Sequence, residues 1–150
     1  MPAKRPDFMS FALVEAEAAV ARGEVPVGAV LVHEGKIVAS AGNRTRELKD
    51  ATAHAEMLVI REASRKLDAE RLTGCDLYVT LEPCAMCAAA ISFARVRRLY
   101  FGAADEKGGA VVNGVRFYAS PTCHHAPEVY PGIGERPASE ILTSFFQNRR

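Results

Sequence analysis

The sequence predicts an α/β protein in which helices cover both faces of a central sheet. Apolar segments of strand length alternate with segments whose apolar residues recur at helical spacing. One of the strand-like segments, DLYVTL, is apolar almost throughout, which is typical of a strand buried on both faces. These two features together favour a sheet that lies between two helical layers.

The first part of the chain predicts a helix followed by a β-hairpin. Apolar residues at helical spacing indicate a helix from Asp7 to Arg22, with Asp7 as its N-cap and Gly23 as its stop. Two strand-like segments, VPVGAVLVH and KIVASAGN, flank a Glu34-Gly35 turn, and this arrangement is typical of a hairpin.

The remainder of the chain alternates between helix and strand. We expect a second helix to begin near Thr52 and to include HAEMLVIREASRKL; the strand DLYVTL, the helix CAMCAAAISFA and the strand RRLYFGA follow it. Residues 104–137 are rich in Gly and Pro, and they predict no more than a short strand or helix. The terminal ASEILTSFFQNRR predicts an amphipathic helix whose inward residues are Ile141, Leu142, Phe145 and Phe146.

Length and composition limit the class of protein. A chain of 150 residues is long enough for a single domain with a sizeable core, and 49% hydrophobic with 25% charged residues is ordinary for a globular chain. A net charge of +1 excludes a global basic field, so a nucleic acid would have to bind at a local patch. Four cysteines do not make a disulfide scaffold, and no apolar segment resembles a signal peptide or a membrane span. We therefore expect a cytoplasmic protein with free thiols and no membrane contact.

Two cysteines and one histidine near predicted helix starts indicate a metal site. Cys84 and Cys87 are three positions apart in the first turn of the third helix, so both sulfurs lie on one side of it. The helix N-terminus favours the thiolate form of these residues. His54, in TAHAE at the start of the second helix, can supply a third ligand and leave the fourth position of a zinc ion to water. We expect one zinc ion per chain.

Glu56 is the candidate catalytic residue beside this metal. It follows His54 by two residues, so it can accept and deliver protons near the ion without ligating it. A zinc-bound water ionises near neutral pH and needs such a partner when it acts as a nucleophile. His54, Glu56, Pro83, Cys84 and Cys87 together form the H-x-E…P-C-x-x-C signature of zinc-dependent base deaminases.

Other interpretations of the cysteines stay open. A purely structural zinc site, in a protein that acts only through interactions, would need a fourth ligand from Cys75 or the Cys123-His124-His125 segment, and neither belongs to a second CxxC. A redox-active CxxC pair would give no functional role to His54 and Glu56. Cys75 alone is typical of a small core residue. The Cys123-His124-His125 segment predicts a loop near the mouth of the active site or, alternatively, a second metal site.

The chain resembles the cytidine deaminase-like superfamily and, within it, the bacterial tRNA adenosine deaminases. The segments that carry the resemblance span nearly the full chain: EVPVGAVLV (24–32), GNRTRE (42–47), TAHAE (52–56), LYVTLEPCAMCAAAI (77–91), FGA (101–103) with Asp105 and Lys107 beyond it, and the terminal SFFQNRR. This resemblance implies a three-layer α/β/α fold with a mixed five-stranded sheet. It also implies a homodimer that hydrolyses an amidine C–N bond and so converts the wobble adenosine of a tRNA anticodon to inosine.

The resemblance implies contacts with the substrate as well. Asn43 becomes a base-contacting residue, Val27 lies against the base, and the last helix touches the anticodon loop. Considered alone, Asn43 is also typical of a strand end. Since other members of the superfamily deaminate free cytosine, guanine or cytidine with the same core motif, a small-molecule deaminase is the alternative function.

Basic residues are the candidates for phosphate contacts. Arg149 and Arg150 at the end of the chain and the Arg44–Arg46 loop are the strongest of them. Arg95, Arg97 and Arg98 follow the third helix, and on composition alone all of these arginines are equally typical of solvated surface or of a subunit contact.

Overall fold

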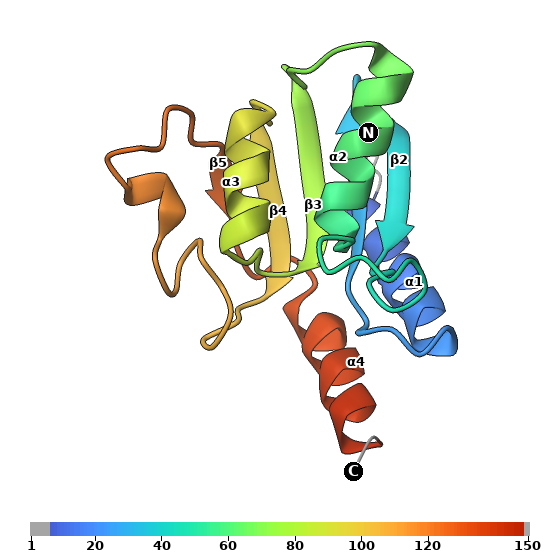
Figure 1. The fold of residues 1–150 in the computed structure, drawn as a ribbon. Coiled ribbons are helices and arrows are strands. Elements are labelled where there is room, and N and C mark those ends of the chain that lie inside the picture. The colour runs from blue at the N-terminus through green and yellow to red at the C-terminus, as the bar shows by residue number, and fades with distance from the viewer. Residues whose placement is uncertain (1–6, 149–150) are drawn as a thin grey trace, which may run out of the picture.

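The computed structural model describes residues 7–148. Over this range one five-stranded sheet, with the strand order β2-β1-β3-β4-β5, is combined with helices (Figure 1). In chain order the elements are α1 (Phe8–Ala21), β1 (Gly28–His33), β2 (Lys36–Gly42), α2 (Ala55–Leu67), β3 (Cys75–Leu81), α3 (Ala85–Phe93), β4 (Arg98–Ala103), the 3-10 helix η1 (Phe117–Ala119), β5 (Glu128–Tyr130) and α4 (Glu135–Gln147).

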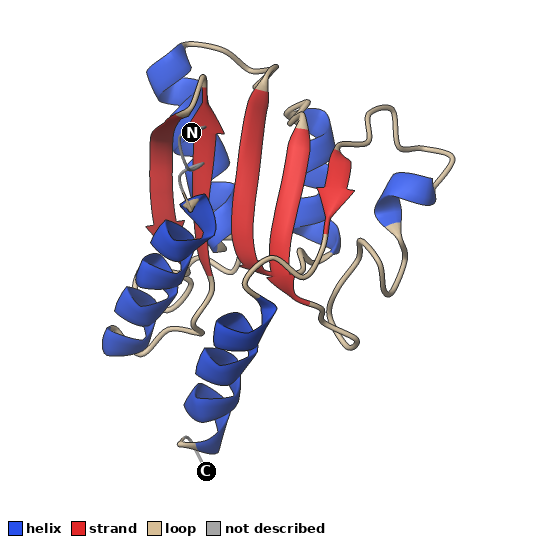
Figure 2. Cartoon of the chain, turned by 180° about the vertical axis from the view of Figure 1, so that it is seen from behind, coloured by secondary structure: helices blue, strands red, loops and turns tan. Residues whose placement is uncertain are grey.

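The sheet is mixed, and helices lie on both of its faces. β1 pairs antiparallel with β2 and with β3, whereas β3, β4 and β5 run parallel to one another. α2 and α3 cover one face, and α1 and α4 lie on the other (Figures 1 and 2). The three-layer α/β/α fold with a mixed five-stranded sheet is therefore confirmed. Because β3 and β4 are parallel, both end at the same edge of the sheet, and α4 extends beyond that edge (Figure 1).

The predicted cap and stop of α1 and the predicted turn between β1 and β2 are present in the structure. Asp7 caps α1, because its carboxylate accepts a hydrogen bond from the backbone N–H of Ser10, and Gly23 follows the helix with a φ of 77°. Glu34 and Gly35 have φ angles of 51° and 74°. Two successive positive φ angles suit the tight turn of a two-residue hairpin, and β1 and β2 accordingly pair directly.

Most of the buried apolar side chains lie between the sheet and the α2–α3 layer. The strands contribute fully buried residues to this core, among them Leu31, Leu77, Leu99 and Phe101. A smaller cluster lies under α1 on the other face. The described helices include none that is long and apolar enough to cross a lipid bilayer.

Three boundaries and one burial prediction differ from the structure. β1 begins at Gly28, three residues after the start of the predicted strand at Val25. α2 begins at Ala55 rather than near Thr52, and α4 begins at Glu135, three residues before the predicted helix. Phe145 is buried, but Phe146 is 55% exposed, so the inward orientation predicted for Phe146 is wrong. The physical reason is that α4 extends past the sheet edge (Figure 1), and Phe146 lies in the wall of an open groove there instead of the core.

Candidate active site

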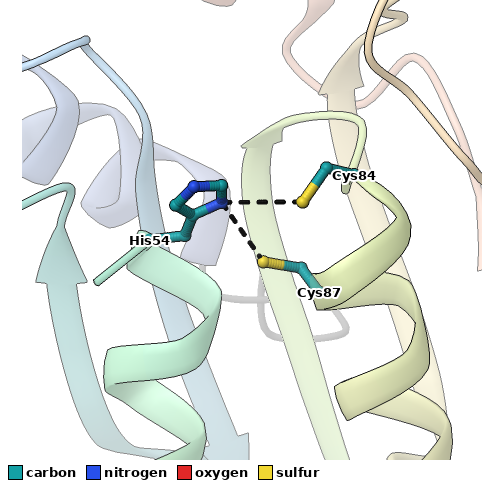
Figure 3. A group of neighbouring side chains, drawn as sticks. All are labelled: His54, Cys84 and Cys87. Atoms are coloured by element: carbon teal, nitrogen blue, oxygen red, sulfur yellow. Dashed lines mark hydrogen bonds between the residues drawn. The ribbon is translucent and has the colours of Figure 1, made fainter. Parts of the chain in front are cut away.

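The starts of two helices bring the predicted metal ligands together. His54 and Cys84 are the N-caps of α2 and α3, one residue before the first helical turn in which both were expected, and Cys87 lies in the first turn of α3. Figure 3 shows the imidazole of His54 directed toward the two sulfur atoms from the opposite helix. The ligands come from two segments of the chain, His54 from the start of α2 and both cysteines from the start of α3, and the packing of α2 beside α3 brings them together.

The spacing of the three donor atoms fits a zinc ion. His54 Nδ1 lies 3.6 Å from Cys84 Sγ and 3.5 Å from Cys87 Sγ. A tetrahedral zinc ion, with Zn–S bonds of about 2.3 Å and Zn–N bonds of about 2.05 Å, separates nitrogen from sulfur by about 3.6 Å. All three donor atoms lie within 4.8 Å of one another. One imidazole and two thiolates are also the soft donors that zinc prefers, so both the geometry and the chemistry of the site suit this metal.

The protonation of the two cysteines supports the same conclusion. A hydrogen bond from Cys87 lowers the pKa of Cys84 to about 4, with a further contribution from His54, and together these outweigh the effect of burial. The same contact with Cys84, together with burial, raises the pKa of Cys87. Two sulfurs this close compete for one proton unless a cation balances both negative charges, and a divalent metal does so.

Glu56 lies beside the three donors and is almost fully buried. Its side chain is 4% exposed and lines the same cleft as His54 and Cys84. Burial raises the pKa of Glu56 to about 7, against the opposing effects of its own backbone N–H and of His54. A carboxyl group with a pKa near neutrality can both take up and release a proton at physiological pH.

A small cleft opens over these residues. Its volume is about 270 Å³, just below the range of about 300–1,000 Å³ that is typical of ligand pockets. The cleft therefore suits one small ring system. It is lined by Val25, Val27, Asn43, Thr45, His54, Glu56, Leu81, Glu82, Cys84, Asp105 and Gly108.

Asn43 lies in the wall of this cleft, and its side chain has a second role. Its Oδ1 accepts a hydrogen bond of 2.8 Å from the backbone N–H of Ala55, the first residue of α2. The interpretation of Asn43 as a mere strand end is thus incomplete, because the residue also caps a helix from a distance. Since Oδ1 is engaged, the Nδ2 amide group is the part of Asn43 that can meet a ligand.

Four of the arginines considered for phosphate contacts, Arg44, Arg46, Arg97 and Arg98, have side-chain partners within the described part of the chain. Arg44 pairs with Glu47, and Arg46 donates a hydrogen bond to the carbonyl of Gly23. Arg97 and Arg98 form ion pairs at the end of the sheet opposite the cleft, with Asp76 and Glu128 respectively. Arg149 and Arg150 lie outside the described residues.

The remaining cysteines and histidines form no second metal cluster within residues 7–148. Cys75 is fully buried in β3, as expected of a small core residue. Cys123 lies 3.6 Å from Ser92 Oγ, and His125 Nε2 lies 2.8 Å from the carbonyl oxygen of Val96. These contacts place the segment beside the C-terminal end of α3. The prediction of a loop at the mouth of the active site is therefore wrong.

Two buried carboxylates, Glu82 in the wall of the cleft and Glu24 behind Thr45 of that wall, were not singled out from the sequence. Glu24 is 1% exposed and Glu82 is 2% exposed, and each accepts hydrogen bonds from backbone N–H groups of a distant loop. The available signal was an acidic residue directly adjoining an apolar strand, in EVPVGAVLV and in LYVTLEPC. That signal does not identify the loop that provides the hydrogen-bond donors.

Known proteins resemble this chain in sequence and in fold. The pattern of the cytidine and deoxycytidylate deaminase zinc-binding region matches residues 2–103. A tRNA-specific adenosine deaminase of Agrobacterium fabrum (strain C58) is 64% identical over 148 residues, with 99% of this chain and 97% of that protein covered. One of Aquifex aeolicus is 48% identical, with 95% and 94% covered. A solved structure from a study of A-to-I editing by tRNA:A34 deaminases at the wobble position has a TM-score of 0.89 and 67% identity, covering 90% of this chain and 98% of that one.

Proposed function

The chain belongs to the family defined by the cytidine and deoxycytidylate deaminase zinc-binding region, and we propose that it hydrolyses adenosine to inosine at the wobble position of a tRNA anticodon. The observation that carries this proposal is the position of His54 Nδ1 at 3.6 and 3.5 Å from two cysteine sulfurs, beside the buried carboxyl group of Glu56. The relatives named as tRNA adenosine deaminases match over nearly their full length, which favours the same substrate here.

His54, Cys84 and Cys87 would hold the zinc ion. Bound there, zinc supplies a Lewis acid that lowers the pKa of water in its fourth position. Glu56 accepts a proton from the water as its oxygen bonds to the ring carbon, and delivers that proton to the ring nitrogen of the base. It then accepts the second proton from the hydroxyl group now on the carbon and passes it to the amine, so that the C–N bond breaks, ammonia leaves and the carbonyl group of inosine forms. Its burial and its place in the wall of the cleft, beside the metal ligands, suit both transfers.

Asn43 and Val27 would hold the base in the cleft. Val27 is 5% exposed and presents an apolar surface to the cavity, which suits contact with the face of a ring. The Nδ2 group of Asn43 donates to an acceptor atom of the base, because Oδ1 is already engaged with α2. The volume of about 270 Å³ accommodates a base, and the target base would leave the stack with its neighbours to reach the residues at the metal site.

A second groove favours an RNA substrate over a free base. It has a volume of about 730 Å³, runs along α4, and shares Val25, Leu81 and Asp105 with the cleft. Nucleotides that flank the target base would lie there, and Phe146 offers an exposed ring in its wall. Arg149, Arg150 and the Arg44–Arg46 loop would add local charge, so we infer a moderate dependence of binding on salt.

We further propose that the protein is a cytoplasmic homodimer. Phe93 at the end of α3 is 73% exposed and Val115 is 67% exposed, so each offers apolar surface that a second subunit could cover. Sedimentation of the purified protein tests this proposal, and a dimer should have twice the mass of one chain.

An activity panel tests the substrate. The enzyme should convert adenosine in an anticodon stem-loop, while free adenine, cytosine and guanine remain unchanged under the same conditions. Turnover of a free base together with an inert stem-loop would instead identify a small-molecule deaminase. If the zinc-loaded wild-type protein turned over none of these substrates, a structural zinc protein would be favoured.

A further inference from the structure

We propose that Glu82 is a positioning residue that fixes one wall of the substrate cleft by holding the loop of residues 105–113. This proposal rests on the function proposed above, because the consequence for catalysis assumes that the cleft takes the substrate base. Glu82 itself acts through the loop and not through the reacting atoms.

The carboxylate of Glu82 accepts five hydrogen bonds from this single loop. Its Oε1 accepts from the backbone N–H of Asp105 at 2.9 Å and from the side-chain amide of Asn113 at 2.8 Å. Its Oε2 accepts from the backbone N–H groups of Val111, Val112 and Asn113 at 3.0, 2.9 and 3.0 Å. A carboxylate offers about four lone-pair sites, so these donors saturate both oxygens. Glu82 consequently has no free site with which to act as a base.

Burial makes these hydrogen bonds necessary. Glu82 is 2% exposed, and no ion pair joins it to a cation within the described part of the chain. Its negative charge is therefore balanced by N–H dipoles alone, and a buried charge without such donors would be strongly unfavourable.

The loop packs against the chain segment that carries the metal ligands. Glu82 is two residues before Cys84, and the backbone N–H of Ala110 donates to the carbonyl of Pro83 at 2.9 Å. A Cβ atom on Gly109 would lie 2.4 Å from the carboxyl carbon of Glu82. Only glycine permits this approach, so the sequence of the loop is fitted to the carboxylate at this point.

The same loop supplies a wall of the cleft. Asp105 and Gly108 line the cavity opposite Asn43, and the backbone of Asp105 is held directly by Glu82. Asp105 also borders the groove along α4, so its position affects both parts of the substrate site. Without the hydrogen bonds of Glu82, the loop of residues 105–113 would no longer hold one wall of the cleft in place. The metal ligands would keep their positions, because they lie at the starts of α2 and α3.

Glu82→Gln tests this role, since it keeps the size of the side chain but replaces one acceptor oxygen by an NH₂ group that faces N–H donors. We expect the variant to keep one zinc per chain. We expect KM for an anticodon stem-loop to rise about fivefold or more, as the loss of a buried acceptor predicts. Native trypsin should cleave after the exposed Lys107 faster by a similar factor. Asn113→Ala removes one of the five donors. It should therefore raise both KM and the rate of cleavage after Lys107, but by less than Glu82→Gln does.

Two controls separate positioning from general destabilisation. Glu24→Gln alters an equally buried carboxylate that holds residues 45–47, and it should leave Lys107 protected. Glu70→Gln removes an exposed charge far from the cleft and should change neither readout. A Glu82 variant with unchanged KM and unchanged cleavage after Lys107 would overturn the proposal, as would equal cleavage in the Glu24 variant. If the wild type were inactive on RNA, the proposed function would fail, while zinc content and proteolysis would still test the hold on the loop.

Discussion

The side-chain oxygen of Asn43 accepts a 2.8 Å hydrogen bond from the backbone N–H of Ala55, the residue between His54 and Glu56. One residue thereby joins the wall of the cleft to the helix start that carries His54 and Glu56. The carbonyl of Asn43 is held in addition by Arg22, whose guanidinium donates to it at 3.2 Å. The position of the Asn43 amide group, which we propose contacts the base, thus depends on the same contact that stabilises the start of α2.

Asn43→Asp should separate the two roles of this residue. The aspartate keeps an oxygen for Ala55 N–H at a helix N-terminus, where a negative charge is favourable, so thermal stability and zinc content should be retained. It loses the Nδ2 donor, and kcat/KM should fall about 5- to 100-fold, as expected for one buried hydrogen bond. Asn43→Ala should lose stability as well as activity. Equal activity of Asn43→Asp and wild type would exclude a base contact through Nδ2.

Cys87→Ala should remove the metal and destabilise the fold. Binding of the ion ties the starts of α2 and α3 together, so its binding free energy contributes to folding. Metal analysis of the purified variant should find little zinc, and its melting temperature should fall. Cys123→Ala is the matched control, because Cys123 lies beside Ser92 and outside the metal cluster. Full zinc occupancy in Cys87→Ala would contradict the assignment of this ligand.

The stability contributed by Glu24 should depend on pH. Burial raises the pKa of Glu24, but the backbone N–H groups of Glu47 and Arg46 outweigh burial, so the folded-state pKa lies below the ordinary 4.5. A depressed pKa means that the stabilisation is fully present above the unfolded-state pKa and is lost as the pH falls through the folded-state pKa. Glu24→Gln should lower the free energy of unfolding by about 1–3 kcal/mol at pH 7.

Denaturant unfolding at pH 7 and below pH 4.5 checks this expectation. The difference between wild type and Glu24→Gln should shrink as the pH falls, and Glu70→Gln should match the wild type throughout. A difference that stays constant down to pH 3 would show that the ionised carboxylate is not the stabilising form.

Deletion of residues 147–150 should weaken RNA turnover through KM while zinc content stays unchanged. Arg149 and Arg150 are removed, and each phosphate contact that is lost should reduce the slope of log affinity against log salt by about 0.7. Initial rates on an anticodon stem-loop at several salt concentrations provide the measurement. An unchanged KM with an unchanged salt slope would exclude these arginines from the RNA contact.

The sequence predicts best those features that depend on neighbouring residues. The Glu34-Gly35 turn, the Asp7 cap and the cysteine pair follow from short segments whose local chemistry decides the outcome. The approach of His54 to the cysteines was predicted from their places at helix starts, from the need of zinc for a third ligand and from the H-x-E…P-C-x-x-C signature, and the 3.6 and 3.5 Å distances are consistent with it.

Features that depend on distant partners were less predictable. β5 consists of three residues in a segment rich in Gly and Pro, and it is a strand because β4 offers a free edge for pairing. Glu24 and Glu82 are buried only because distant loops provide the N–H donors. Phe146 shares the helical spacing of buried residues but lies where α4 has passed the edge of the sheet. In each case tertiary contact decided the outcome, and local pattern did not.

The central claim is that Glu56 carries protons for the deamination of adenosine beside a zinc ion. The most direct measurement is inosine formation in an anticodon stem-loop by Glu56→Gln, with zinc content determined on the same sample. Glutamine preserves the size of the side chain and can still hydrogen-bond, but it cannot carry a proton. We expect Glu56→Gln to hold one zinc per chain and to form inosine at a rate about 10²–10⁴-fold lower than that of the wild type. A zinc-loaded Glu56→Gln variant that retains more than about a tenth of the wild-type rate, well above that range, would contradict it.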